Sequence, residues 1–61
     1  MNPSISLNQA LSWLASQNYD SFEDADVICD ILRAYGEPGW RFEPVMLFRD
    51  DTTYRIGVSS L

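Results

Sequence analysis

The residues with the most potential for chemistry are five carboxylates: Asp20, Glu23, Asp24, Asp26 and Asp30. An EF-hand calcium loop would need acidic or amide side chains at alternate positions, followed by a glycine and a distal glutamate. Here apolar residues of a helical segment occupy the ligand positions. The cluster therefore predicts no metal site. Negative groups in a first helical turn are instead stabilised by the helix dipole.

On a helical projection, three of these carboxylates share one narrow strip: Glu23, Asp26 and Asp30. Such an acidic strip could meet a basic protein surface or imitate the phosphates of nucleic acid. Duplex DNA carries about one charge per 1.7 Å of its axis, and a strip that also contains Arg33 is much less dense. Acidic mimicry is therefore a third hypothesis, behind a helix-stabilising role and a simple acidic docking face.

Catalytic side chains are scarce in this sequence. It contains no histidine or lysine, and Cys29 is its one cysteine. A thiol nucleophile needs a base or a nearby cation to lower its pKa, so Cys29 is interpreted as a buried structural thiol. A hydrolase with paired carboxylates would need two acids around a pocket, whereas these acids fall on an exposed strip or in turns. The sequence predicts a protein that is not an enzyme and has no cofactor.

Length and composition predict one small domain over residues 1–61. A chain this short buries only about 60% of its unfolded surface, and its eight aromatic residues (two Trp, three Tyr and three Phe) compensate for this. The lone cysteine indicates a reducing, cytoplasmic setting. No stretch approaches the roughly 20 apolar residues of a membrane span. A net charge of -5 with four dispersed arginines argues against direct binding to nucleic acid or membranes.

The first predicted helix covers about residues 6–17. Its apolar positions recur with helical spacing: Leu7, Ala10, Leu11, Leu14 and Ala15. Ser6 and Gln9 form a capping box, and Ile5 and Ala10 are placed as a hydrophobic staple. The opposite face is uncharged, and Trp13 lies off the apolar stripe.

The second predicted helix covers about residues 21–35. Asp20 with Glu23, or Ser21 with Asp24, could cap its start. Gly36 suits a left-handed C-cap, and Pro38-Gly39 is typical of a type II turn. Apolar side chains cover most of the circumference of this helix, which indicates a buried central element with the first helix on one flank and a sheet on another.

The rest of the chain predicts a β-hairpin with strands at about 41–49 and 54–60. A short loop gives a core face with three cross-strand pairs: Arg49 with Tyr54, Leu47 with Ile56, and Val45 with Val58. The outer face then carries Met46 and Phe48 beside Arg55 and Gly57. Pro44 suits a strand edge because it cannot donate to a ladder. The expected fold is α+β, with two helices followed by a hairpin packed on the second helix.

The leading hypothesis is a small acidic module that binds another protein. Its candidate contact residues are exposed apolar or charged side chains: Trp13, Met46, Phe48, Arg55, Glu23, Asp26 and Asp30. Trp40 is expected to be a core anchor that closes the hairpin on the second helix. Small acidic chains of this kind are typical of inhibitors and adaptors encoded by phages or mobile elements. The alternative is an obligate homo-oligomer, such as a homodimer, in which two hairpins join edge to edge or stack by their outer faces.

Overall fold

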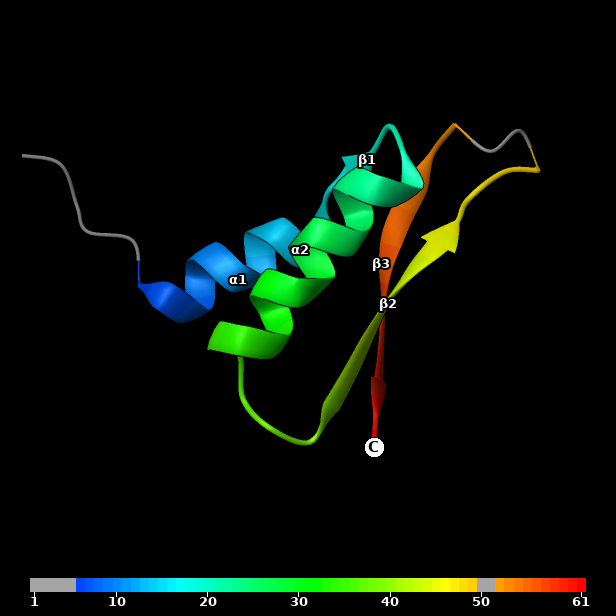
Figure 1. The fold of residues 1–61 in the computed structure, drawn as a ribbon. Helices are drawn as coiled ribbons and strands as arrows, with labels where there is room; N and C mark the ends of the chain where they lie inside the picture. Colours follow the sequence, from blue (N-terminus) through cyan, green and yellow to red (C-terminus); the bar gives the residue numbers. More distant parts are fainter. Residues whose placement is uncertain (1–5, 50–51) are drawn as a thin grey trace, which may run out of the picture.

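The computed structural model describes residues 6–49 and 52–61. Their elements follow the order α1 (Leu7–Ser16), β1 (Asn18–Tyr19), α2 (Phe22–Tyr35), β2 (Trp40–Met46) and β3 (Tyr54–Ser60) (Figure 1). The three strands form an antiparallel sheet in the order β1-β3-β2. The predicted α+β class is confirmed, but the sheet has a third strand. At two residues, β1 is too short to show the alternation that identifies a strand in a sequence.

Both helices pack against the sheet. Helix α2 contacts β2 and β3, whereas α1 contacts α2 and β3 (Figure 1). The buried core contains residues from both helices and both long strands: Leu11, Ala25, Cys29, Leu32, Phe42, Tyr54 and Ile56. A core this small leaves many large apolar side chains exposed.

The start of each helix is fixed by local hydrogen bonds. The backbone N–H of Gln9 donates to Oγ of Ser6 at 3.1 Å, and the N–H of Ser6 donates to Oε1 of Gln9 at 3.0 Å, which confirms the capping box. For α2, Ser21 is the cap, since its Oγ accepts from the N–H of Asp24 at 3.1 Å. The predicted staple involves Ile5, which lies outside the described residues.

Helix α2 is less buried than its composition predicts. Only one stripe is fully covered, formed by Ala25, Cys29 and Leu32. Val27 is 57% exposed, and Tyr35 is 64% exposed. The prediction of a helix buried nearly all round is wrong, because the sheet and α1 cover one side of α2 and the described chain supplies no further layer for the other side.

Gly36 ends α2 in a different way from the one predicted. Its φ of -82° and ψ of 176° are extended, so the predicted left-handed C-cap is wrong. Glycine is needed here because a Cβ would lie 2.5 Å from the carbonyl oxygen of Leu32. Gly39 does adopt a positive φ, 97°, as the third residue of the predicted type II turn requires.

The register of the hairpin also differs from the prediction. Val45 lies opposite Arg55, three residues away from its predicted partner Val58. The residues that close the hairpin are the cause, since the N–H of Leu47 donates to the carbonyl of Thr53 at 2.9 Å. An odd shift exchanges the two faces of a strand. Trp40, Phe42, Pro44 and Met46 therefore share the face of Tyr54 and Ile56.

The outer face of the sheet is consequently not the predicted one. Met46 belongs to the helix-covered face, opposite Tyr54, and Phe48 lies beyond the end of β2. The predicted pairing of Met46 and Phe48 with Arg55 and Gly57 is wrong. Val45 takes their place on the outer face, where a Cβ added to Gly57 would lie 2.6 Å from Cγ2 of Val45.

The observed register predicts a reversal in the effect of Gly57→Ala. In the wild type the added methyl group meets the stiff Val45 side chain, and the free energy of unfolding should fall by about 1 kcal/mol or more. In a Val45→Ala background the same change should be neutral, or stabilising by about 0.5 kcal/mol, because glycine weakens a strand. Urea denaturation measures both values. An equal loss in both backgrounds would contradict this register.

Candidate functional site

A hollow with walls from several elements lies between α1 and one end of the hairpin. We call it the α1–hairpin groove. Its lining comes from α1, the end of α2 and both long strands: Asn8, Leu11, Ser12, Ala15, Leu32, Gly36, Glu37, Trp40, Phe42 and Val58. Its volume is about 320 Å³. Most of these side chains are apolar, so the groove is suited to an apolar group.

The groove exists because the hairpin extends past the helices. The turn before β2 and the end of β3 project beyond the end of α2 (Figure 1). Trp40 is 47% exposed and Val58 is 51% exposed, although Phe42 and Ile56 further along the same face are buried. The expected role of Trp40 as a core anchor is wrong. In the observed register Trp40 lies opposite Ser60, at the end of the strand pair. The predicted register did not place it there.

In the part of the chain that the structure describes, one edge of β3 is open beside this groove. Strand β1 pairs only with Tyr54 and Arg55. The ladder bonds Leu47 N–H to Thr53 C=O and Leu61 N–H to Gly39 C=O show that odd-numbered positions join β3 to β2. Since alternate residues of an antiparallel strand turn their backbone groups to opposite sides, Val58 and Ser60 direct theirs away from β2. Both residues are exposed, and within the described residues no strand pairs with them on this side.

The predicted apolar contact residues lie on separate surfaces. Trp13 is 62% exposed. It lines a hollow formed by α1 residues alone, together with Gln9, Ala10 and Leu14. Met46 ends β2 on the side of the hairpin loop and Phe48 follows it, and neither lines the hollow that contains Trp13. The structure therefore does not bring Trp13 together with Met46 and Phe48.

Next to Met46 lies a small aromatic cluster that sequence reasoning did not identify. The rings of Phe22 and Tyr54 meet edge to face, with centroids 5.8 Å apart and planes at 80°. Phe22 is half exposed, and Met46 stands opposite Tyr54 in the ladder. The cluster anchors the start of α2 to the sheet.

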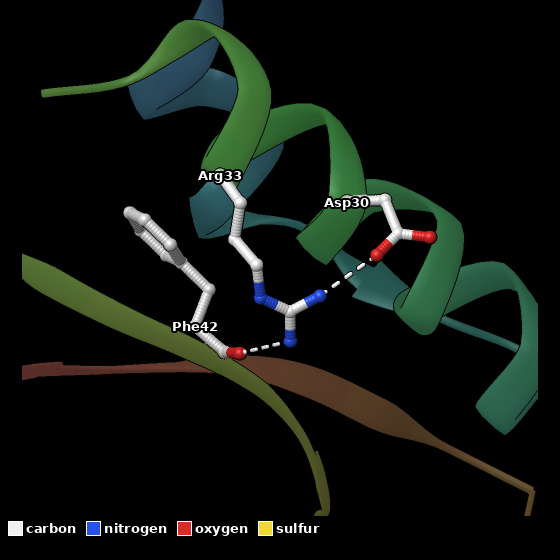
Figure 2. A network of polar contacts seen from close by, with 3 residues as sticks. All are labelled: Asp30, Arg33 and Phe42. Carbon is white, nitrogen blue, oxygen red and sulfur yellow. Dashed lines mark hydrogen bonds and ion pairs between the residues drawn. The ribbon is translucent and has the colours of Figure 1, made fainter. Parts of the chain in front are cut away.

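The acidic strip is tied to the sheet through an arginine. Nη1 of Arg33 donates to Oδ1 of Asp30 at 2.7 Å, and Nη2 donates to the carbonyl oxygen of Phe42 at 2.6 Å (Figure 2). Glu23 is exposed and Asp26 is half-buried. Residues 6–49 and 52–61 contain no group of three or more His, Cys, Asp or Glu side chains placed to hold a metal ion.

Cys29 has the environment of a structural thiol. It is fully buried. Burial raises the pKa of the thiol, Arg33 opposes this shift, and the carboxylates of Asp26, Asp30 and Glu43 add to it. Burial also raises the pKa of Tyr19, with a smaller contribution from Cys29. The Tyr19 hydroxyl donates to the carbonyl of Leu14, which links β1 to α1. Both groups therefore stay protonated at neutral pH.

Comparisons with known proteins do not assign this site: no family model, no curated protein and no solved structure matches the chain. Within the described ranges, neither helix has the length and apolar character needed to cross a membrane.

The raised pKa of Cys29 predicts a loss of stability at alkaline pH. Above about pH 8.5, the ordinary thiol pKa, the unfolded chain releases this proton while the folded chain retains it, so the free energy of unfolding falls as pH rises. Cys29→Ala should remove the decline between about pH 8.5 and 9.5, below the range in which tyrosine titrates. Tyr19→Phe is the matched control and should keep it. Urea denaturation across this range measures the effect, and an unchanged decline in Cys29→Ala would contradict the assignment.

Proposed function

We propose that this protein is a non-enzymatic binding module that holds an extended, apolar segment of another protein. The segment would lie along the open edge of β3 and place its side chains in the α1–hairpin groove. The observation that carries this proposal is the combination of the two features at one place: Val58 both lines the groove and belongs to the open edge.

The apolar lining supports binding by burial. Trp40 and Val58 are each about half exposed in the free chain. Large aromatic side chains bury roughly 150–250 Å², so covering the exposed half of Trp40 would contribute about 2–3 kcal/mol. Tryptophan is also enriched among the residues that dominate binding energy in protein interfaces.

The backbone of β3 supports a strand as the occupant. An extended peptide that adds to a sheet edge gains main-chain hydrogen bonds, and pockets for its alternate side chains give specificity. Val58 and Ser60 offer such backbone groups, with the groove on the helix side of Val58. A helical occupant would fill the groove but would not form hydrogen bonds with these backbone groups.

The charges favour a neutral or basic segment. Glu37 is the one charged residue in the groove lining, and the net charge of the chain is -5. The groove lining contains no cysteine, and the chain contains no histidine or lysine. These features support binding rather than catalysis, and a module of this kind would act by occluding or bridging its partner.

The proposal predicts that groove residues carry peptide binding. Random peptides selected by display on the immobilised wild-type chain serve as the probe. Trp40→Ser or Val58→Ser should weaken their binding about tenfold or more, since each buried side chain contributes about 1.5–3 kcal/mol. Fluorescence anisotropy measures the affinities, and circular dichroism checks the fold of each variant.

Trp13→Ser and Phe48→Ser are the matched controls, because both side chains are 62% exposed and lie outside the groove. Both variants should bind like the wild type. Peptides whose binding depends on Trp13 or Phe48 and is unaffected by Trp40→Ser would contradict the proposal.

Amide hydrogen exchange tests whether the bound peptide is a strand added to β3. A bound strand should slow exchange of the Val58 and Ser60 amides and leave the Met46 amide, on the other edge, unchanged. NMR of the free and peptide-bound chain measures these rates. Binding without protection at Val58 and Ser60 would contradict strand addition. If the Val58 and Ser60 amides became protected as the protein concentration rises without peptide, the occupant of the groove would be a second copy of this chain.

A further inference from the structure

The other edge of the sheet, along β2, is built differently from the edge of β3. Among the described residues, 6–49 and 52–61, no strand lies beyond β2 in the order β1-β3-β2. Since the odd-numbered positions join β2 to β3, the backbone groups of Trp40, Phe42, Pro44 and Met46 point to the free side. An open row of this kind invites pairing with another chain.

The side chain of Arg33, from α2, reaches the middle of this edge. Its Nη2 donates to the carbonyl oxygen of Phe42 at 2.6 Å (Figure 2). Nη1 is held by Asp30 at 2.7 Å. Both side chains are substantially exposed, and ion pairs of that kind add little stability. The consequence of the Asp30–Arg33 pair is therefore geometric, because it fixes the guanidinium over the edge.

Pro44 adds a second obstacle at the next outward position. Proline has no backbone N–H and cannot donate to an incoming strand. At Phe42 the acceptor is already engaged by Arg33, and at Pro44 the donor is absent. Two consecutive hydrogen-bonding positions in the middle of a seven-residue strand are thus impaired.

We propose that Asp30, Arg33 and Pro44 form an edge guard that prevents β2 from pairing with β2 of a second copy. Natural proteins protect free edges with charged side chains and prolines, and here one arginine does so by binding the edge carbonyl itself. The sheet then has one guarded edge and one open edge, so strand addition is directed to β3. The guard acts whether or not β3 binds a peptide.

The test removes the guard and measures association. In the double variant Arg33→Met with Pro44→Val, the Phe42 carbonyl is released and residue 44 gains an N–H. The molar mass from light scattering should rise with concentration to at least double the wild-type value at the same concentration. NMR hydrogen exchange should show new protection of the amides of Phe42 and residue 44 in the associated species.

Two variants serve as controls. Arg41→Met loses the same charge from the outer face of β2, and Arg33→Lys keeps a charged donor at the guard position. Both should follow the wild-type mass curve. A folded double variant with the wild-type curve would overturn the proposal.

If the double variant does not fold, the single variant Arg33→Met is the test of the proposal. It should fold because methionine keeps the aliphatic part of the arginine side chain. It should exceed the wild-type mass at the highest concentrations. A folded Arg33→Met variant with the wild-type mass curve would also overturn the proposal.

Discussion

The structure depends on the contact between one narrow stripe of α2 and the inner face of the hairpin. Ala25 and Cys29 are fully buried in this contact, and their small side chains let the helix approach Phe42 and Ile56 closely. At the end of the helix Gly36 is needed for a local reason, because a Cβ there would lie 2.5 Å from the carbonyl oxygen of Leu32. All other elements are arranged around this contact.

The described residues cover one side of the central helix and part of the sheet. Helix α1 covers part of the inner face, and the far end of the hairpin remains open with Trp40 and Val58 half exposed. The α1–hairpin groove lies in the part of the sheet that the described residues leave uncovered. The proposed binding function uses apolar surface that the monomer cannot bury, and the guarded edge of β2 limits where a second chain can join.

Most local interactions were predictable, with the C-cap at Gly36 as the exception, whereas non-local interactions were not. The capping box at Ser6, the cap at Ser21 as one of two options, and the turn at Gly39 follow from residues within four positions of one another. The register could not be predicted, because alternating apolar residues fit two registers and the loop length decides between them. The misplacement of Met46 and the missed exposure of Trp40 both follow from that shift.

By itself, the sequence determined the α+β class, the limits of the helices, the acidic charge and the scarcity of catalytic side chains. These properties depend on composition and on short-range hydrogen bonds. Only the tertiary structure decided which face of β2 packs inward, that Trp40 lines a groove, that β1 covers just two residues of β3, and that Arg33 binds the carbonyl of Phe42. Each of these joins residues from different elements, so the register and the approach of the helices to the sheet determine it.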